Sequence, residues 1–400
     1  MKTTLSYIIV TCNRREPLLK TLRILHTTTP ASVGKWETWV VDNGSTDGTV
    51  NAVGKEFPDV KIISRTTNEG VWARSYAFKP AHGEYVILLD DDSYPIQNTA
   101  KRSIDYLSFN RKCAAVVGQV VLPDGSLEAC AYPTVMLSGA VCIRRSVLME
   151  IGGFRPEFFR KAGEYDLSFR LWNAGYSIKR FEDIVYRHDK VATGRSAGFA
   201  HRMDLRNNLI LVERYLPASL RKEFRADWRQ RYAAVAKQAG HSNSAKLAMA
   251  EAMIWRVRER FSQFISRPRT LSSKTIETIF QLQQQAAAIK KWSVQNNLSK
   301  VAIADFGKNI YATYSGCKRA GLTLTSILDP HPAFTGLFYR NIPILDEISS
   351  LALQPEGIVI SNINPAQVDA VESRIRKAFK CPVLRLWQPT CMDTQRKLAA

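Results

Sequence analysis

A run of apolar residues that ends in three consecutive carboxylates restricts the fold of this 400-residue chain more than any other feature. The run, Tyr85-Val-Ile-Leu-Leu89, has the length and the β-branched content of a buried strand. Because Asp90, Asp91 and Asp92 follow it directly, we expect them at the carboxyl edge of a sheet, where α/β folds bind ligands. A solvated acidic turn is the alternative for these three residues considered alone.

Strand-like segments alternate with helical patterns in front of this run. Strands are predicted over residues 6–10, 36–41 and 61–63, with an amphipathic helix after the first of them. Such alternation indicates βαβ units and a mostly parallel sheet. Asp42 follows the second strand directly, so we expect it at the same sheet edge as Asp90–Asp92.

The charge on the three adjacent acids also has a chemical implication. Neighbouring carboxylates repel one another, so an arrangement of this kind usually requires a counter-ion. A hard divalent cation, held by the carboxylates and by the phosphates of a substrate, would supply the positive charge.

The ordered motifs of residues 5–217 resemble those of the family-2 glycosyltransferases, which are inverting enzymes with the GT-A fold, and in particular bacterial rhamnosyltransferase-like members. The resemblance rests on Val-Val-Asp42-Asn-Gly-Ser-Thr-Asp, Asn68-Glu-Gly, Leu-Leu-Asp90-Asp-Asp92, Gly139-Ala, Gly152-Gly-Phe154, Glu164-Tyr-Asp166-Leu-Ser-Phe-Arg170 with Gly175-Tyr176, His188, and Arg206-Asn207. It implies a mostly parallel central sheet flanked by helices, and a nucleotide-diphosphate sugar as donor.

The same resemblance assigns roles to single residues. Asp92 would bind Mn²⁺ or Mg²⁺, and His188 is a second candidate ligand, although Arg187 separates it from the tyrosine that it directly follows in many relatives. For His188 the alternative is a purely structural histidine. For Arg74 the alternative is a surface arginine, and for Gly139 and Ala140 it is a plain packing role. The candidate nucleotide-sugar-binding residues are Thr11, Arg14, Asp42, Asn68, Arg74, Asp90, Asp91, Gly139, Ala140, Arg195 and Arg206.

Glu164 is the candidate catalytic base. Inversion in one displacement requires a carboxylate that takes the proton of the attacking hydroxyl group, a contribution of roughly 10²–10⁴ in rate. Asp166 stays open as the alternative base, because Gly163 stands where many relatives carry a further acid. Both acids precede a helix expected over residues 167–174, so a purely structural interaction with its positive end is the alternative reading.

Organisation changes after residue 217, and we expect three domains: a catalytic domain over 1–217, a basic helical region over 218–298 and a Rossmann-like α/β domain over 299–400. The helical region carries two apolar rows at helical spacing, with arginines between them. Basic amphipathic helices favour an anionic membrane surface; a helical extension packed on the catalytic domain is the alternative. The rows are Phe224, Trp228, Tyr232 and Val235, and Ile254, Val257, Phe261 and Phe264.

The last hundred residues contain strand candidates at 300–304, 322–328, 357–361 and 383–386. They lack the glycine fingerprint that admits a dinucleotide pyrophosphate, since Gly307 alone stands in the first turn. Asp329 lies about where a ribose-binding acid would be, but a turn acid before Pro330 is the simpler interpretation. We therefore expect a structural or regulatory domain.

Absences define the expected compartment. The first ten residues begin a strand and show no signal peptide, and no apolar run approaches the roughly 18 residues of a membrane span. Seven cysteines without a C-x-x-C pair argue against a disulfide framework and a zinc site. We expect a cytoplasmic protein, with peripheral contact to the inner face of the membrane as an open possibility.

Rival functions make different demands on the sequence. A nucleic-acid binder would explain the net charge of +20 but not the acids gathered at strand ends, so no nucleic-acid partner is expected. A nucleotidyltransferase should carry a glycine-rich loop after the first strand, and Thr11–Arg15 contains no glycine. The favoured function is metal-dependent inverting transfer of a hexose or deoxyhexose from a UDP-, dTDP- or GDP-linked donor to a hydroxyl group, for example on a lipid-linked glycan in cell-surface polysaccharide assembly. A catalytically degenerate nucleotide-sugar-binding protein is the alternative.

Overall fold

The structure, a computed structural model, describes residues 3–96, 98–129, 132–191, 196–265 and 270–390. These residues divide into two compact units. The first holds those within 1–128, 134–195 and 389–400, and the second holds those within 129–133 and 196–388. The domain boundaries expected at residues 217 and 298 stay predictions.

The first unit alternates strands with helices. Its elements in chain order are β1 (Leu5–Thr11), α1 (Arg15–Thr28), η1 (Ala31–Val33), β2 (Trp36–Asp42), α2 (Thr49–Glu56), β3 (Lys61–Ser64), η2 (Gly70–Arg74), α3 (Ser75–Phe78), β4 (Tyr85–Asp90), β5 (Ser93–Pro95), α4 (Thr99–Phe109), β6 (Cys113–Val121), β7 (Val141–Arg144), α5 (Arg145–Glu150), α6 (Gly163–Asn173) and β8 (Ser177–His188).

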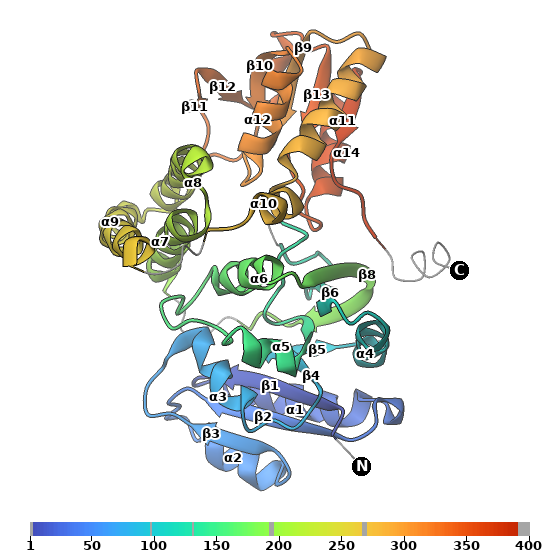
Figure 1. The fold of residues 1–400 in the computed structure, drawn as a ribbon, viewed down its shortest axis with the longest axis vertical. Coiled ribbons are helices and arrows are strands. Elements are labelled where there is room, and N and C mark those ends of the chain that lie inside the picture. Colours follow the sequence, from blue (N-terminus) through green and yellow to red (C-terminus); the bar gives the residue numbers. More distant parts are fainter. Residues whose placement is uncertain (1–2, 97, 130–131, 192–195, 266–269, 391–400) are drawn as a thin grey trace. The chain divides into compact units, whose positions relative to one another are not determined.

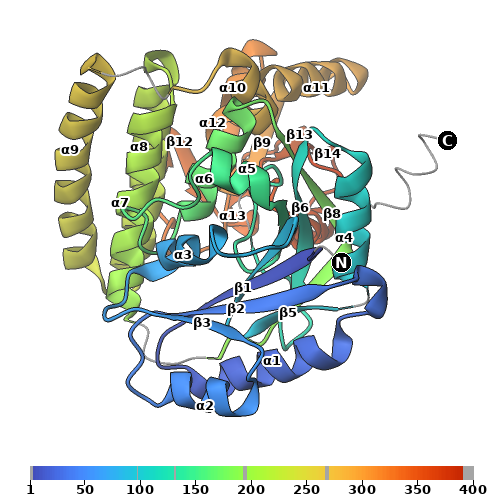
Figure 2. The same ribbon diagram turned by 60° about the horizontal axis from the view of Figure 1, so that its bottom comes forward.

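Within the described residues, the strands of the first unit form an eight-stranded sheet in the order β3-β2-β1-β4-β7-β6-β8-β5 (Figures 1 and 2). The pairs among β1, β2, β3 and β4 are parallel, as is the pair of β6 and β8. β7 runs antiparallel to β4 and β6, and β5 runs antiparallel to β8. The predicted α/β fold is confirmed, with a sheet that is mixed.

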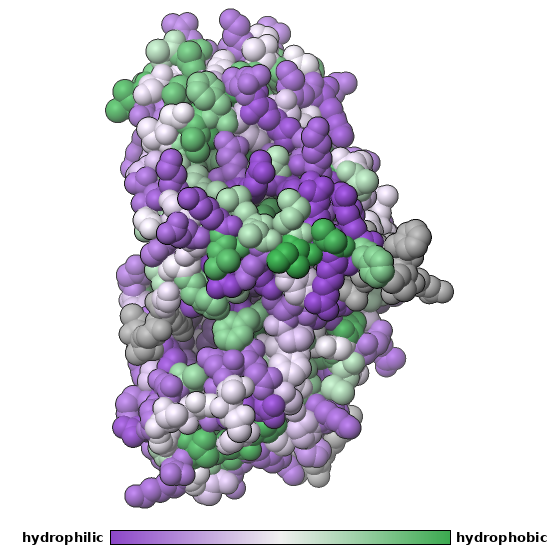
Figure 3. All heavy atoms as spheres, turned by 90° about the vertical axis from the view of Figure 1, so that its left-hand side faces the viewer, coloured by the Kyte–Doolittle hydropathy of each residue, from purple (hydrophilic) through white to green (hydrophobic). Residues whose placement is uncertain are grey.

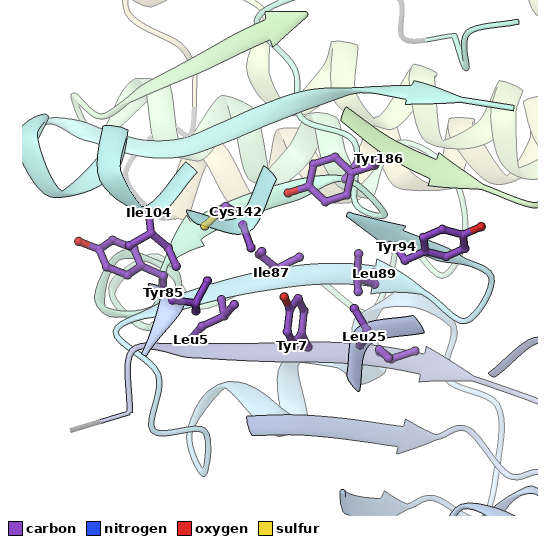
Figure 4. Packing of buried hydrophobic residues seen from close by; sticks show 14 of the residues in the cluster. Leu5, Tyr7, Leu25, Tyr85, Ile87, Leu89, Tyr94, Ile104, Cys142 and Tyr186 are labelled. Atoms are coloured by element: carbon purple, nitrogen blue, oxygen red, sulfur yellow. The ribbon is translucent and has the colours of Figure 1, made fainter. Parts of the chain in front are cut away.

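Two apolar clusters, one on each face of this sheet, explain the helix positions. Leu5, Tyr7 and Ile9 of β1 join side chains of α1, α2 and α4 in one cluster. Ile8, which points to the opposite face, joins α3, α5 and α6 in the other. Figure 2 shows α1 and α2 on one side of the sheet and α3 on the other. In Figure 4, Tyr7 of β1 and Leu25 of α1 lie together within the first cluster.

The second unit begins with long helices and ends in a smaller α/β fold. Its elements are α7 (Ala197–Tyr215), α8 (Ala218–Gln238), α9 (Ser242–Ile265), α10 (Ser273–Phe280), α11 (Leu282–Gln295), β9 (Lys300–Ala304), α12 (Ile310–Arg319), β10 (Thr323–Leu328), β11 (Phe338–Tyr339), β12 (Ile342–Leu345), α13 (Glu347–Leu351), β13 (Gly357–Ile360), α14 (Val368–Ala378) and β14 (Val383–Arg385).

The C-terminal strands form a second sheet in the order β11-β12-β10-β9-β13-β14 among the described residues. All neighbouring strands from β12 to β14 are parallel, and the short β11 runs antiparallel to β12. The expected Rossmann-like α/β layout is therefore confirmed. β11 and β12 are two short strands that the sequence pattern does not predict.

The structure separates the two apolar rows that the helical region was expected to present together. On α8, Phe224 and Trp228 are buried inside the second unit, where Phe224 stacks edge-on against Phe280 with ring centroids 5.0 Å apart. This row is thus part of a core and cannot contact a membrane. On α9, Ile254 and Val257 remain exposed. No helix within the described residues has the length and apolar content needed to cross a membrane.

Candidate active site

The strand register brings the predicted site residues to one edge of the first sheet. Thr11 at the end of β1 lies opposite Asp42 of β2, and Val10 lies opposite Asp90 of β4. The predicted convergence of Asp42 with the acidic row is therefore confirmed. From the other side, the antiparallel β5–β8 pair sets His188 opposite Ser93, the residue after Asp92.

Arg14 forms ion pairs with the last two acids of the row, Asp91 and Asp92. Its Nε donates to Asp91 Oδ1 at 2.7 Å, and its Nη2 pairs with Asp92 Oδ2. Thr11 Oγ1 donates to the other oxygen of Asp91 at 2.9 Å. The guanidinium of Arg14 therefore supplies part of the positive charge that compensates these acids. The sequence pattern had led us to expect this charge from a metal ion.

Asp91 is buried behind the site, although it was expected against the ribose or the donor sugar. Burial raises its pKa to about 6, and Arg14 counteracts this effect. Both of its carboxylate oxygens are engaged, with Thr11 and Arg14. Its observed contacts fix the positions of these two side chains.

Asp92 and His188 face each other, as the metal-site prediction requires. His188 Nε2 lies 3.1 Å from Asp92 Oδ1, and apart from this contact neither of the two buried atoms has a hydrogen-bond partner among the described residues. Burial opposes ionisation of Asp92, but His188 and Arg14 outweigh it and hold its pKa below the usual value.

Glu128 is a site residue that the sequence reading missed. Its Oε2 lies 2.7 Å from His188 Nδ1, so it orients the imidazole ring with Nε2 toward Asp92. Burial lowers the pKa of His188, yet the carboxylates of Asp92 and Glu128 outweigh that effect and raise it to about 10. Glu128 lies after a turn, and its backbone N–H donates to the carbonyl of Val120 at 2.9 Å. No sequence motif identifies Glu128 as a site residue.

The donor set fits a divalent cation whose remaining ligands come from a substrate. A carboxylate and an imidazole are suitable ligands for Mn²⁺, and Mg²⁺ is commonly bound by one or two carboxylates together with substrate phosphates. The described residues contain no group of three or more His, Cys, Asp or Glu side chains placed to hold a metal. Asp92 Oδ1 and His188 Nε2, which contact each other at 3.1 Å, would therefore supply two ligands of such a site, and the imidazole would have to lose its proton to bind the ion.

Arg74 lies behind Asp90. Its side chain is fully buried, donates to the carbonyl of Leu89 at 3.0 Å and pairs with the Asp90 carboxylate. Its burial excludes the alternative of a surface arginine, and its contact orients Asp90. The expected approach of Arg74 to the nucleotide stays a prediction. The Asp90 side chain is about one-third exposed and so remains accessible.

Gly139 allows the chain to pass close to Asp90. A Cβ atom at this position would lie 2.9 Å from Asp90 Oδ2, closer than an ordinary contact. The carbonyl of Gly139 accepts from Ser93 Oγ at 3.0 Å. Ala140, in contrast, is buried in the apolar cluster of the sheet, so the structure gives it the packing role that was its alternative.

Asp42 and Asn68 border the same edge near β2. Asp42 is buried, its Oδ2 accepts from the backbone of Ser45 at 3.2 Å, and its Oδ1 has no hydrogen-bond partner in the described residues. Asn68 is exposed and its carbonyl oxygen accepts from Gly70 N at 2.9 Å and Asn43 Nδ2 at 3.1 Å. An unpartnered buried carboxylate oxygen is suited to accept a hydrogen bond from a ligand.

The two candidate bases differ in their surroundings. Glu164, in the first turn of α6, accepts from Ser138 Oγ at 2.7 Å, next to Gly139. Asp166 is fully buried and receives Arg170 Nη2 at 2.7 Å and Nε at 3.0 Å. Asp166 thus has the contacts of a structural ion pair, and Glu164 has those of a group beside the site.

Two candidate residues remain. Arg195 lies outside the described residues. Arg206 belongs to α7 of the second unit, where it lies 3.6 Å from Glu251 and over the ring of Trp255. Its expected role toward the nucleotide stays a prediction.

Comparison with known proteins found similar sequences for the first part of the chain. Residues 6–160 match the family model described as Glycosyl transferase family 2. Glycosyltransferase AglE of Haloferax volcanii is 27% identical over 205 residues, covering 46% of this chain and 66% of that protein, so the chain spans less than two thirds of this relative.

Two solved structures with a similar course of the chain contain a bound nucleotide sugar. One is the mannosyltransferase PcManGT of Pyrobaculum calidifontis in complex with GDP-Man and Mn²⁺, with 17% identity, a TM-score of 0.44, and coverage of 67% of this chain and 82% of that one. The other is S. aureus TarS 1–349 in complex with UDP-GlcNAc, with 16% identity, a TM-score of 0.48, and coverage of 80% and 93%.

Proposed function

We propose that this chain is a family-2 glycosyltransferase that moves a sugar from a nucleotide-diphosphate donor to a hydroxyl acceptor, with inversion at the anomeric carbon. The match of residues 6–160 to the model of that family supports the proposal. One observation carries the proposal: Asp42, Asp90 and Asp92 meet at one sheet edge, where His188 faces Asp92. A sheet edge with converging acids is where an α/β fold binds a ligand.

The donor is bound through its base and its diphosphate. The unpartnered Oδ1 of Asp42 accepts a hydrogen bond from an N–H group of the base, and Asp90 approaches the ribose or the donor sugar. Asp92 and His188 would hold Mn²⁺ or Mg²⁺ together with the phosphates. When bound, the ion supplies Lewis-acid stabilisation of the diphosphate leaving group.

Glu164 acts as the general base. It takes the proton of the acceptor hydroxyl group while that oxygen forms a bond to the anomeric carbon. The bond between this carbon and the diphosphate oxygen breaks, and its electron pair leaves with the diphosphate. Ser138 holds Glu164 by donating to only one carboxylate oxygen, so the other oxygen stays available for the proton.

The donor sugar is a hexose or a deoxyhexose, with rhamnose among the candidates, carried on UDP, dTDP or GDP. The acceptor hydroxyl belongs to a glycan, lipid-linked in the simplest case, and the product enters cell-surface polysaccharide. A protein that binds the donor without turnover is the competing function.

Two measurements test this proposal. A thermal-shift panel of UDP-, dTDP- and GDP-sugars, with and without Mn²⁺, should identify at least one nucleotide whose stabilising effect requires the metal. Release of nucleoside diphosphate from that donor then reports on turnover, since slow hydrolysis of the donor needs no identified acceptor.

The variant Glu164→Gln separates catalysis from binding. Glutamine can still accept from Ser138, so donor binding should stay unchanged, while turnover should fall by roughly 10²–10⁴. Glu16→Gln, on the exposed part of α1, serves as the matched control and should behave as the wild type. Full turnover in Glu164→Gln contradicts the base role, and a wild type that binds no nucleotide sugar contradicts the function.

A further inference from the structure

Helix α9 packs on the rest of the second unit through its smallest side chains. Ala245, Ala248 and Ala252 are buried in one cluster with Leu205 and Leu209 of α7. Successive residues of a helix are 100° apart, so these three alanines define one face of α9. The opposite face must therefore point away from α7.

That opposite face is apolar. Its large side chains recur at helical spacing and expose about half to two thirds of their surface. In Figure 3 hydrophobic side chains run across the middle of the view, with hydrophilic ones above and below. The residues are Leu247 (46% exposed), Met253 (56%), Ile254 (69%), Val257 (64%) and Phe261 (67%), and together we call them the α9 stripe.

The charges of α9 are sorted between the two faces. Glu251 pairs with Arg202 of α7 at 3.0 Å, and the buried Glu259 pairs with Arg214 of α7 at 2.9 Å. Both acids of the helix thus turn inward. The cations Lys246, Arg258 and Arg260 are exposed and border the α9 stripe.

A helix with an exposed apolar stripe, bordering cations and inward-facing acids has the chemistry of a membrane-surface helix. We propose that the α9 stripe lies in the interfacial layer of an anionic lipid bilayer, with the bordering cations at the lipid phosphates. A second copy of the chain suits this face less well, because it would bring the same cations together.

The buried row of α8 provides the contrast. It has similar helical spacing and equally large side chains, yet Phe224 and Trp228 are already covered by the protein. Contiguous exposed apolar side chains on a folded protein mark an interaction site. The proposal is independent of the glycosyltransferase function, since it concerns only the outer face of α9.

Vesicle flotation of the full chain tests the proposal. Wild-type protein should float with phosphatidylcholine vesicles that contain roughly one third phosphatidylglycerol and much less with pure phosphatidylcholine vesicles. The triple variant Met253→Gln, Ile254→Gln and Val257→Gln should bind the anionic vesicles at least about tenfold more weakly. Because all three side chains are exposed, the variant should keep the thermal midpoint of the wild type.

A matched control removes apolar surface elsewhere in the same unit. Ile348→Gln on α13, where the side chain is 82% exposed, should leave flotation unchanged. Absence of wild-type flotation with anionic vesicles, or equal flotation of the triple variant, overturns the proposal. A dimer that sedimentation detects without vesicles and that the triple variant loses would assign the stripe to a second copy and overturn it as well.

Discussion

Glu128→Gln tests whether the carboxylate behind His188 serves metal binding. Glu128 Oε2 lies 2.7 Å from His188 Nδ1, and glutamine keeps the length of the side chain but removes its charge. Partners of this kind change metal affinity by about 10–100-fold, which corresponds to about 1.4–2.8 kcal/mol. Titration of Mn²⁺ into protein saturated with nucleoside diphosphate should show this loss by calorimetry.

The matched control for this experiment is Lys190→Met. Lys190 lies 3.6 Å from the other oxygen of Glu128 and is half exposed, so its removal should change the Mn²⁺ affinity by less than about twofold. Nucleotide binding measured without metal should be the same in both variants and in the wild type. An unchanged Mn²⁺ affinity in Glu128→Gln would refute the reasoning, because the imidazole would then not be the ligand that Glu128 orients.

Three further outcomes follow from buried polar groups. Glu259→Ala removes the carboxylate that pairs with the buried guanidinium of Arg214 and should destabilise the second unit by about 3–5 kcal/mol in urea unfolding, whereas replacing both residues by leucine and methionine should restore most of the loss. Burial raises the pKa of Asp227 to about 6, although the nearby cation Arg340 acts in the opposite direction. The native state therefore binds a proton at this carboxylate more readily than the unfolded chain does. The stability of the second unit should therefore fall by roughly 1–3 kcal/mol as the pH rises from 4 to 7, and Asp227→Asn should remove that part of the pH dependence. Gly139→Ala sets a Cβ atom 2.9 Å from Asp90 Oδ2 and should weaken donor binding by about 1–3 kcal/mol in the thermal-shift assay, while a wild-type affinity would show that the site can shift at no cost.

The sheet edge was accessible to sequence reasoning because its signals are local. An apolar β-branched run indicates a strand, and the residue that follows it lies at the strand end wherever the strand is placed. Since parallel strands share an edge, Asp42 and Asp90–Asp92 could be brought together without knowing any contact. The same argument predicted β9, β10, β13 and β14 of the C-terminal sheet, but not the short strands β11 and β12.

The partners of these acids were not accessible in the same way. Glu128 and His188 are 60 positions apart, and nothing in either neighbourhood shows that the turn after β6 returns one to the other. The contacts of Arg14 with Asp91 and Asp92 were not predicted either, and its expected place in the nucleotide pocket stays a prediction. Hydrogen bonds of this kind depend on the three-dimensional positions of loops that are far apart in the sequence. Hydrophobic periodicity carries no information about those positions.

The amino-acid sequence by itself determined β1 to β4, the acids at the ends of β2 and β4, and the amphipathic character of the middle helices. Only the tertiary structure decided that the apolar row of α8 is a core and that the α9 stripe faces outward. Both rows have similar spacing, and spacing specifies only that a helix has an apolar face. Which face is covered depends on the neighbouring helices, because burial is a property of the assembled fold.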